Sequence, residues 1–290
     1  MGIFQTAVAI YLTIKMLYDG TGFKSLLTTN QPKLSKGEEQ GYLTSGIHLA
    51  PSTMSTVNTC RFASAGCQAA CLNTSGHGGI GLDVDGLNDI QRIRIARTNL
   101  LFSDRSRWLQ IFEREMALFL RKADRLDLIP VFRPNITSDI QWEKIAVTRD
   151  GVQYRNMFEA YPEVQFYDYT AYPAHRRDLT ISNYHLTFSL KEDNDSTALQ
   201  ALASGMNVAV AIRAKKHALP STFSGFPVID GDLDDLRFLD PKGGHIVGLS
   251  PKGRAAMHDT SGFIRDVGSV IGGPRRDGWF YYDGRVTIAA

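Results

Sequence analysis

Short β-rich segments alternate with helical segments through the middle of the chain, and this alternation limits the possible folds more than any other feature. Neighbouring parallel strands need a crossover between them, and that crossover is usually a helix. The candidate strands are Gly46–Pro51, Pro130–Asn135, Val164–Thr170, His185–Leu190, Asn207–Ala214, Phe226–Asp230 and His245–Ser250. The candidate helices are Leu87–Ser103, Ser106–Arg125 and Ser196–Ser204. The pattern predicts an α/β protein with a parallel sheet.

Six or seven buried strands in succession favour a partial or closed β/α barrel, and a doubly wound open sheet is the alternative. The end of the chain does not follow this strand–helix alternation. There, Asp283–Gly284 lies between Trp279–Tyr282 and Arg285–Ile288, which is typical of a C-terminal β-hairpin with a type I′ turn. No linker, repeat or break in composition divides the 290 residues. We therefore predict a single domain over residues 1–290.

The apolar segment over residues 1–18 is predicted to be a docking helix, since its apolar side chains fall on one helical face. It is too short and too polar to span a bilayer. It also lacks the basic region and the cleavage site of a signal peptide. We therefore expect a cytoplasmic protein that does not enter a membrane. The net charge of +2 gives no overall field that would attract nucleic acid or an acidic membrane.

The cysteines are the most informative feature for function. The chain has three, and Cys60, Cys67 and Cys71 follow the first predicted strand in a polar, glycine-rich loop over residues 58–80. An odd number of cysteines cannot form a closed set of disulfides. Three thiolates can hold a [4Fe–4S] cluster and leave one iron open, because thiolates are the usual ligands of such clusters. A zinc site needs four ligands, and His77 is a possible fourth. We predict a [4Fe–4S] cluster, with zinc or unliganded, redox-active thiols as alternatives.

Polar residues collect after the predicted strands, where β/α barrels carry their chemistry. The candidate catalytic residues are Asp139, Asp168 and Lys252, and the candidate ligand-binding residues are Arg133, Asn135, Ser138, Tyr169 and Arg213. Arg133 near the end of a buried strand needs a carboxylate or an anionic ligand, since an unpaired buried charge is costly. We expect Asp139 or Asp168 to be that partner and its pKa to fall. No P-loop, G-x-G-x-x-G or G-x-S-x-G motif occurs. Their absence argues against a nucleotide triphosphatase, a Rossmann oxidoreductase and an α/β-hydrolase.

A series of ordered segments resembles a family of bacteriophage proteins called the gene product eighty-eight family. The segments are GYLTSGIHLAPS, GCQAACLNTSG, RTNLLF, FRPNITSDIQWE, FYDYTAYP, GMNVAVAI, IDGDLDDLRFLDP, IVGLSPKG and DTSGFI. This resemblance implies a phage protein in the cytoplasm of a bacterial host, but it implies no activity. The layout is also similar to radical S-adenosylmethionine enzymes, which place a cysteine loop after the first barrel strand. The spacing here is C-x6-C-x3-C instead of C-x3-C-x2-C, so use of S-adenosylmethionine does not follow.

Two functions fit the sequence. The first is an iron–sulfur enzyme that acts on a small molecule or nucleotide, in nucleotide or nucleic-acid modification. The second is a non-catalytic phage protein that binds nucleic acid or a host factor and contains structural zinc. The second reading draws on the stretch Gln91–Arg125, which has nine Arg or Lys against four Asp or Glu. That stretch lacks the interleaved aromatic residues of a single-strand binder.

Overall fold

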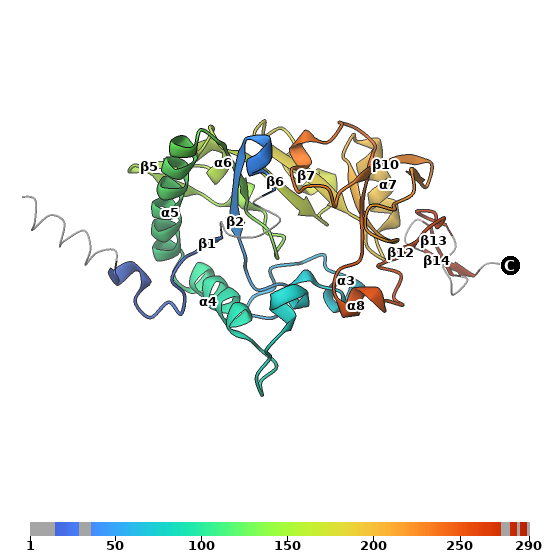
Figure 1. Ribbon diagram of the computed structural model, residues 1–290, viewed down its shortest axis with the longest axis horizontal. Coiled ribbons are helices and arrows are strands. Elements are labelled where there is room, and N and C mark those ends of the chain that lie inside the picture. The colour runs from blue at the N-terminus through green and yellow to red at the C-terminus, as the bar shows by residue number, and fades with distance from the viewer. Residues whose placement is uncertain (1–14, 29–35, 274–278, 283–284, 289–290) are drawn as a thin grey trace, which may run out of the picture.

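The structure is a computed structural model that describes residues 15–28, 36–273, 279–282 and 285–288. Its centre is a ten-stranded sheet in the order β1-β2-β3-β6-β7-β8-β11-β10-β9, with β12 paired to β8 (Figure 1). The strands are β1 (Leu27–Thr28), β2 (Tyr42–Ile47), β3 (Ile129–Arg133), β6 (Gln165–Thr170), β7 (Tyr184–Ser189), β8 (Val208–Arg213), β9 (Thr222–Phe223), β10 (Phe226–Asp230), β11 (Ile246–Leu249) and β12 (Arg265–Asp266). All neighbouring pairs from β2 to β10 are parallel.

The predicted α/β fold with a mostly parallel sheet is confirmed, and of the predicted partial or closed barrel, the closed form is absent from the described part of the chain. Strands β2, β3, β6, β7 and β8 lie side by side in sequence order, as in a barrel. The sheet then ends in two short strands, β1 and β9, which pair antiparallel with β2 and β10. Among the described strands, none pairs β1 with β9. Each of these edge strands is antiparallel to its neighbour and has two residues.

Each of the seven predicted strands overlaps an observed strand, and the largest difference lies in the first. Strand β2 covers Tyr42–Ile47 instead of Gly46–Pro51. It pairs with β3 from Tyr42 opposite Ile129 to Gly46 opposite Arg133. Beyond Ile47 the backbone leaves the sheet, and the amide of Ala50 donates to the hydroxyl of Thr98 at 2.8 Å. A side chain of helix α4 (Asp89–Ser103) thus replaces the sheet partner, as buried amides require.

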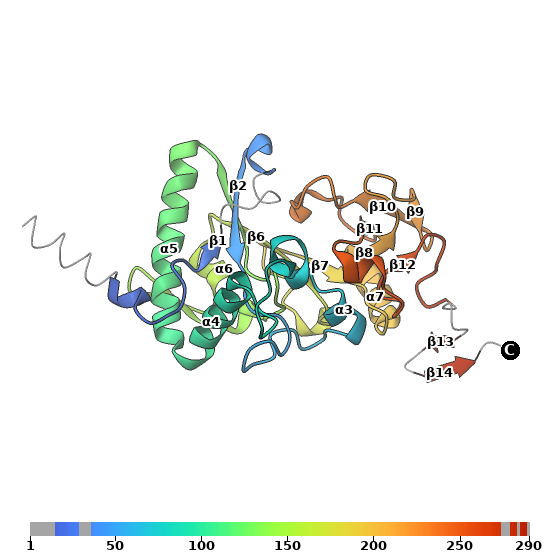
Figure 2. The ribbon, with the colours of Figure 1, turned by 60° about the horizontal axis from the view of Figure 1, so that its bottom comes forward.

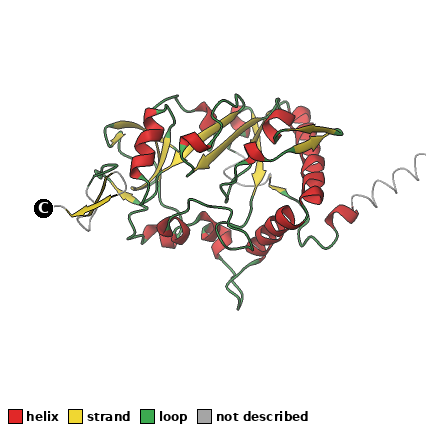
Figure 3. Cartoon of the chain, turned by 180° about the vertical axis from the view of Figure 1, so that it is seen from behind, coloured by secondary structure: helices red, strands yellow, loops and turns green. Residues whose placement is uncertain are grey.

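The helices are α3 (Ala65–Ala69), α4 (Asp89–Ser103), α5 (Arg105–Leu126), α6 (Met157–Ala160), α7 (Asp195–Ala203) and α8 (Arg254–Met257). The predicted helix pair is confirmed as α4 and α5. A capping box starts α4, since Asn88 and Gln91 bond each other's backbone amides. Figure 2 shows α5 and α7 near opposite ends of the sheet. Figure 3 shows α3, α4 and α8 along one side of the strands.

Aromatic side chains fill the core between α5 and the sheet. The ring of Trp108 stacks on the rings of Phe112 and Trp142 with centroids 5.6 Å and 5.4 Å away. Phe132 of β3 meets Phe112 edge-on at 5.9 Å and Phe166 of β6 at the same distance. Each fully buried aromatic side chain contributes about 2–3 kcal/mol through the hydrophobic effect. This packing holds β3 and β6 in place, and the carboxyl ends of both strands reach the candidate site.

The remaining elements lie at the periphery. Strands β4 (Val147–Arg149) and β5 (Val152–Tyr154) form a separate antiparallel pair. Strands β13 (Trp279–Tyr282) and β14 (Arg285–Ile288) also pair antiparallel, and the turn predicted at residues 283–284 lies outside the described residues. Most of the predicted docking helix at residues 1–18 likewise lies outside them. No described helix has the length and apolar character needed to cross a membrane. The single-domain organisation stays a prediction.

Candidate functional site

A cavity of about 240 Å³ lies over the carboxyl ends of the parallel strands. Its wall includes all three cysteines and residues at or after β2, β3, β6, β7, β8 and β11. The predicted site residues that line it are Asp139, Lys252, Arg133, Asn135, Ser138 and Tyr169. Asp168 and Arg213 are not among the lining residues. The structure therefore brings the cysteine segment and the ends of distant strands to one place, as expected of parallel strands that share a sheet edge.

Hydrogen bonds from the segment after β7 hold the cysteine segment over the sheet. The Ser64 hydroxyl accepts a bond from the amide of Cys67 at 3.2 Å and so caps α3. The carboxylate of Glu192 accepts bonds from the Ser64 hydroxyl at 2.5 Å and from the amide of Gly66 at 2.6 Å. A Cβ on Gly66 would come within 2.9 Å of the Glu192 carboxyl carbon. Close packing and a charge-assisted bond therefore fix α3, and with it Cys67, against the end of β7.

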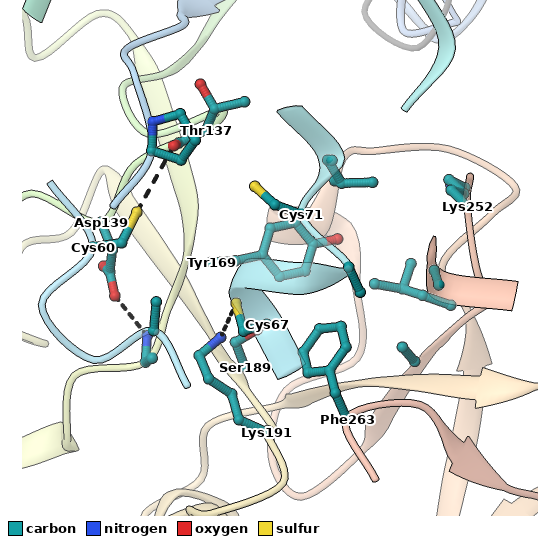
Figure 4. Close-up of a pocket in the computed structure, with 18 of the residues that line it drawn as sticks. Cys60, Cys67, Cys71, Thr137, Asp139, Tyr169, Ser189, Lys191, Lys252 and Phe263 are labelled. Atoms are coloured by element: carbon teal, nitrogen blue, oxygen red, sulfur yellow. Dashed lines mark hydrogen bonds between the residues drawn. The ribbon is translucent and has the colours of Figure 1, made fainter. Parts of the chain in front are cut away.

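The three thiols lie on two sides of the cavity (Figure 4). Figure 4 shows the Cys60 sulfur on one side and the sulfurs of Cys67 and Cys71 on the other. The Cys60 thiol is 3.8 Å from the carbonyl of Thr137, and the Lys191 ammonium donates to the Cys67 sulfur at 3.3 Å. The Cys71 sulfur accepts a bond from the backbone amide of Asn73 at 3.5 Å. Burial raises the pKa of Cys60 to about 11, and burial also raises the pKa of Cys71.

The described side chains do not form a site for a single metal ion. Among the described residues, no group of three or more Cys, His, Asp or Glu side chains could hold one metal ion. Zinc needs its ligand sulfurs about 2.3 Å from a common centre. His77, the possible fourth ligand, is exposed and does not line the cavity. A [4Fe–4S] cluster differs from a single ion, because it binds each thiolate at a different iron.

Arg133 has a different partner from the one expected. Its guanidinium pairs with Asp235 at 2.9 Å, and its charge lies 4.8 Å from the ring centre of Tyr169. Asp139 pairs instead with Arg177 at 3.3 Å and accepts a bond from a backbone amide. The expected fall in a carboxyl pKa is wrong, because burial raises the pKa of Asp139 and outweighs the effect of Arg177.

Asp168 lies beneath the cavity and organises its wall. Its carboxylate accepts bonds from the amide and the side chain of Asn135 at 2.8 Å and 2.9 Å, and from the hydroxyl of Tyr184 at 2.9 Å. Asn135 in turn accepts bonds from the Ser138 hydroxyl and the Trp142 indole. Burial raises the pKa of Asp168 to about 7. These bonds give Asp168, Asn135 and Ser138 a role in shaping the loop after β3.

The last two predicted residues also have partners in the protein. Lys252 reaches the cavity and pairs with Asp232 at 2.7 Å. Arg213 pairs with Asp266 at 2.9 Å and donates to the carbonyls of Met257 and Asp259, so it links β8 to the C-terminal segment. Arg213 therefore stabilises elements next to the cavity without lining it.

Sequence reasoning missed the roles of Lys191, Arg177 and Asp235. The position of Lys191 just after a predicted strand was a usable signal, because residues there reach the sheet edge. Arg177 and Asp235 gave no such signal, since their partners are distant in the chain. The basic stretch Gln91–Arg125 does not form one exposed face, because Arg94 and Arg97 within it are buried.

The comparisons with known proteins give one match. The model of the family described as Gene product 88 matches residues 25–267, which include the cysteine segment and the whole main sheet. A search of curated proteins and a search of solved structures each found no match. None of the comparisons supports a radical S-adenosylmethionine layout.

Proposed function

This chain belongs to the Gene product 88 family of phage proteins, and from that premise we propose that it is an iron–sulfur enzyme acting on a small molecule or nucleotide. The observation that carries the proposal is that all three cysteines of the chain line one cavity. They reach it from a single loop segment that is anchored over the carboxyl ends of parallel strands. Binding sites in open α/β sheets are usual at this edge.

The residues that would hold the cluster are Cys60, Cys67 and Cys71. Bound to three thiolates, a [4Fe–4S] cluster has one iron without a protein ligand, and that iron offers an open coordination position to a substrate. Two aromatic rings of the cavity wall, Tyr169 and Phe263, offer flat apolar surface for a planar group. The protein thus supplies a partly apolar cavity beside the three thiols.

The size and charge of the cavity favour a small ligand. Its volume of about 240 Å³ is below the range usual for drug-sized ligands. Two cationic side chains of the wall, Arg133 and Lys252, are already neutralised by Asp235 and Asp232. They can orient an anionic group without attracting one strongly. A compact substrate, or one part of a nucleotide, therefore fits better than a whole nucleic-acid strand.

Metal analysis of protein purified without air tests the proposal. We expect brown protein that contains iron and acid-labile sulfide in equal amounts, and we expect Cys67→Ser to lose both. His77→Ala is the matched control, because His77 lies in the same loop but does not line the cavity. Colourless protein that contains zinc and no sulfide would refute the proposal and favour the non-catalytic alternative with a structural metal.

A further inference from the structure

Arg94 of α4 is a buried cation without an acidic partner among the described residues. Its residue is 7% exposed, and its Nε has no hydrogen-bond partner. Its Nη1 donates to the backbone carbonyl of Asn73 at 3.3 Å and also to the side-chain oxygen of Asn73. An unpaired guanidinium in the interior is costly unless a negative charge is nearby. The ionisable group that faces Arg94 and favours its charge is the thiol of Cys71.

Asn73 connects Arg94 to that thiol. The backbone amide of Asn73 donates to the Cys71 sulfur at 3.5 Å. Both oxygens of Asn73 are held by Arg94, so the guanidinium fixes the residue that donates to the sulfur. Helix α4 also holds the following turn, because the Gln91 side chain donates to the carbonyl of Gly78 at 2.9 Å. The Cys71 sulfur therefore faces a positive charge and a fixed amide from the α4 side.

Lys191 places a second cation at the same site from the opposite element. The residue is 6% exposed, and its ammonium is 3.3 Å from the Cys67 sulfur (Figure 4). The ring of Phe263 covers it at 5.8 Å. No described carboxylate forms an ion pair with Lys191, whereas Arg133 and Lys252 at the same cavity each have one. Of the cations that line the cavity, Lys191 is therefore the one that directly contacts a cysteine sulfur.

We propose that Arg94 and Lys191 are the counter-charges of the cysteine-bound centre and set its reduction potential. The inference rests on the proposed function, because it concerns the same three thiols. Three thiolates give the site a net negative charge, and an added electron makes that charge larger. Nearby cations and donors to sulfur stabilise the reduced form, since net charge and hydrogen bonds to the sulfurs set cluster potentials. Arg94 and Lys191 are thus positioning residues that act through Cys71 and Cys67.

The test is the midpoint potential of the reconstituted protein, followed by electron paramagnetic resonance during a redox titration. Arg94→Gln and Lys191→Gln should each lower the reduction equilibrium constant at least about tenfold, or ~59 mV for one electron. Arg94→Lys and Lys191→Arg keep the charge and should restore most of the potential. The matched control is Arg97→Gln, which removes another buried arginine of α4 that bonds the carbonyl of Ser25. Equal potentials in wild type, Arg94→Gln and Lys191→Gln would overturn the inference.

Iron content separates this inference from the proposed function. If Arg94→Gln retains no iron, the potential of Lys191→Gln decides alone. If wild-type protein binds no iron and sulfide, the proposed function fails. If wild-type protein binds both and its potential equals those of Arg94→Gln and Lys191→Gln, only this inference fails.

Discussion

Replacing Glu192 with glutamine should loosen the cysteine segment without unfolding the protein. The carboxylate accepts one bond from the Ser64 hydroxyl and one from the amide of Gly66, both charge-assisted. Glutamine keeps one acceptor oxygen and places an amino group against the other donor. About one charge-assisted bond is lost, and such a bond contributes about 1.5–3 kcal/mol. A loss of about 2 kcal/mol makes local opening of residues 64–71 about 30-fold more frequent.

Hydrogen exchange followed by mass spectrometry measures that opening. Peptides covering residues 64–71 should exchange about 30-fold faster in Glu192→Gln, whereas peptides from α5 should not change. Glu159→Gln is the matched control, because Glu159 forms an exposed pair with Arg155 and contacts no part of the cysteine segment. Unchanged exchange over residues 64–71 in Glu192→Gln would show that this carboxylate does not hold the site together.

Three further changes test the surroundings of the site. Burial raises the pKa of Asp168 to about 7, above the ~3.9 of an unfolded chain, so the native state binds this proton more tightly. This stabilisation is fully present below about pH 4 and is lost as the pH rises through 7. Urea titrations should therefore show the unfolding free energy falling by about 1.4 kcal/mol per pH unit between about 5 and 7. This pH dependence of the unfolding free energy should vanish in Asp168→Asn. An identical slope in both proteins would contradict the raised pKa of Asp168. Arg177→Met should lower the unfolding free energy in urea by about 3–5 kcal/mol, because it leaves the carboxylates of Asp139 and Glu143 buried without their cation; a loss below about 1 kcal/mol would disprove the pairing. Gly46→Ala should cost about 1–3 kcal/mol in thermal unfolding, since its Cβ would lie 2.4 Å from a carbonyl of the neighbouring strand, and an unchanged melting temperature would refute that contact.

The sequence was sufficient for the central strands because their signal is local. A buried parallel strand shows as a short apolar run between turn signals, and the runs at β3, β8 and β11 have this form. The edge strands β1 and β9 have two residues each, which is too short to produce any period. Because these antiparallel edges end the sheet, the sequence could favour a barrel but could not show that the sheet stays open.

The site was predictable where it depends on strand ends and unpredictable where it depends on distant partners. The cysteine segment and the loop after β3 both follow strands, so their meeting at one edge follows from parallel pairing. Asp168 and Tyr169 are neighbours in β6 and point to opposite faces of the sheet, but Tyr169 lines the cavity and Asp168 does not. Arg133 pairs with Asp235, which lies 102 residues away. Only the packing of the finished fold decides such a pair.

Mössbauer spectroscopy of protein reconstituted with iron-57 and sulfide tests the central claim most directly. Three cysteine ligands leave one iron of a [4Fe–4S] cluster without a thiolate, so its environment differs from that of the other three. We predict a cluster spectrum with one distinct iron, and we predict that Cys60→Ser, Cys67→Ser and Cys71→Ser each diminish or abolish it. A spectrum of isolated iron without sulfide bridges, or a cluster that survives unchanged in all three variants, would contradict the account.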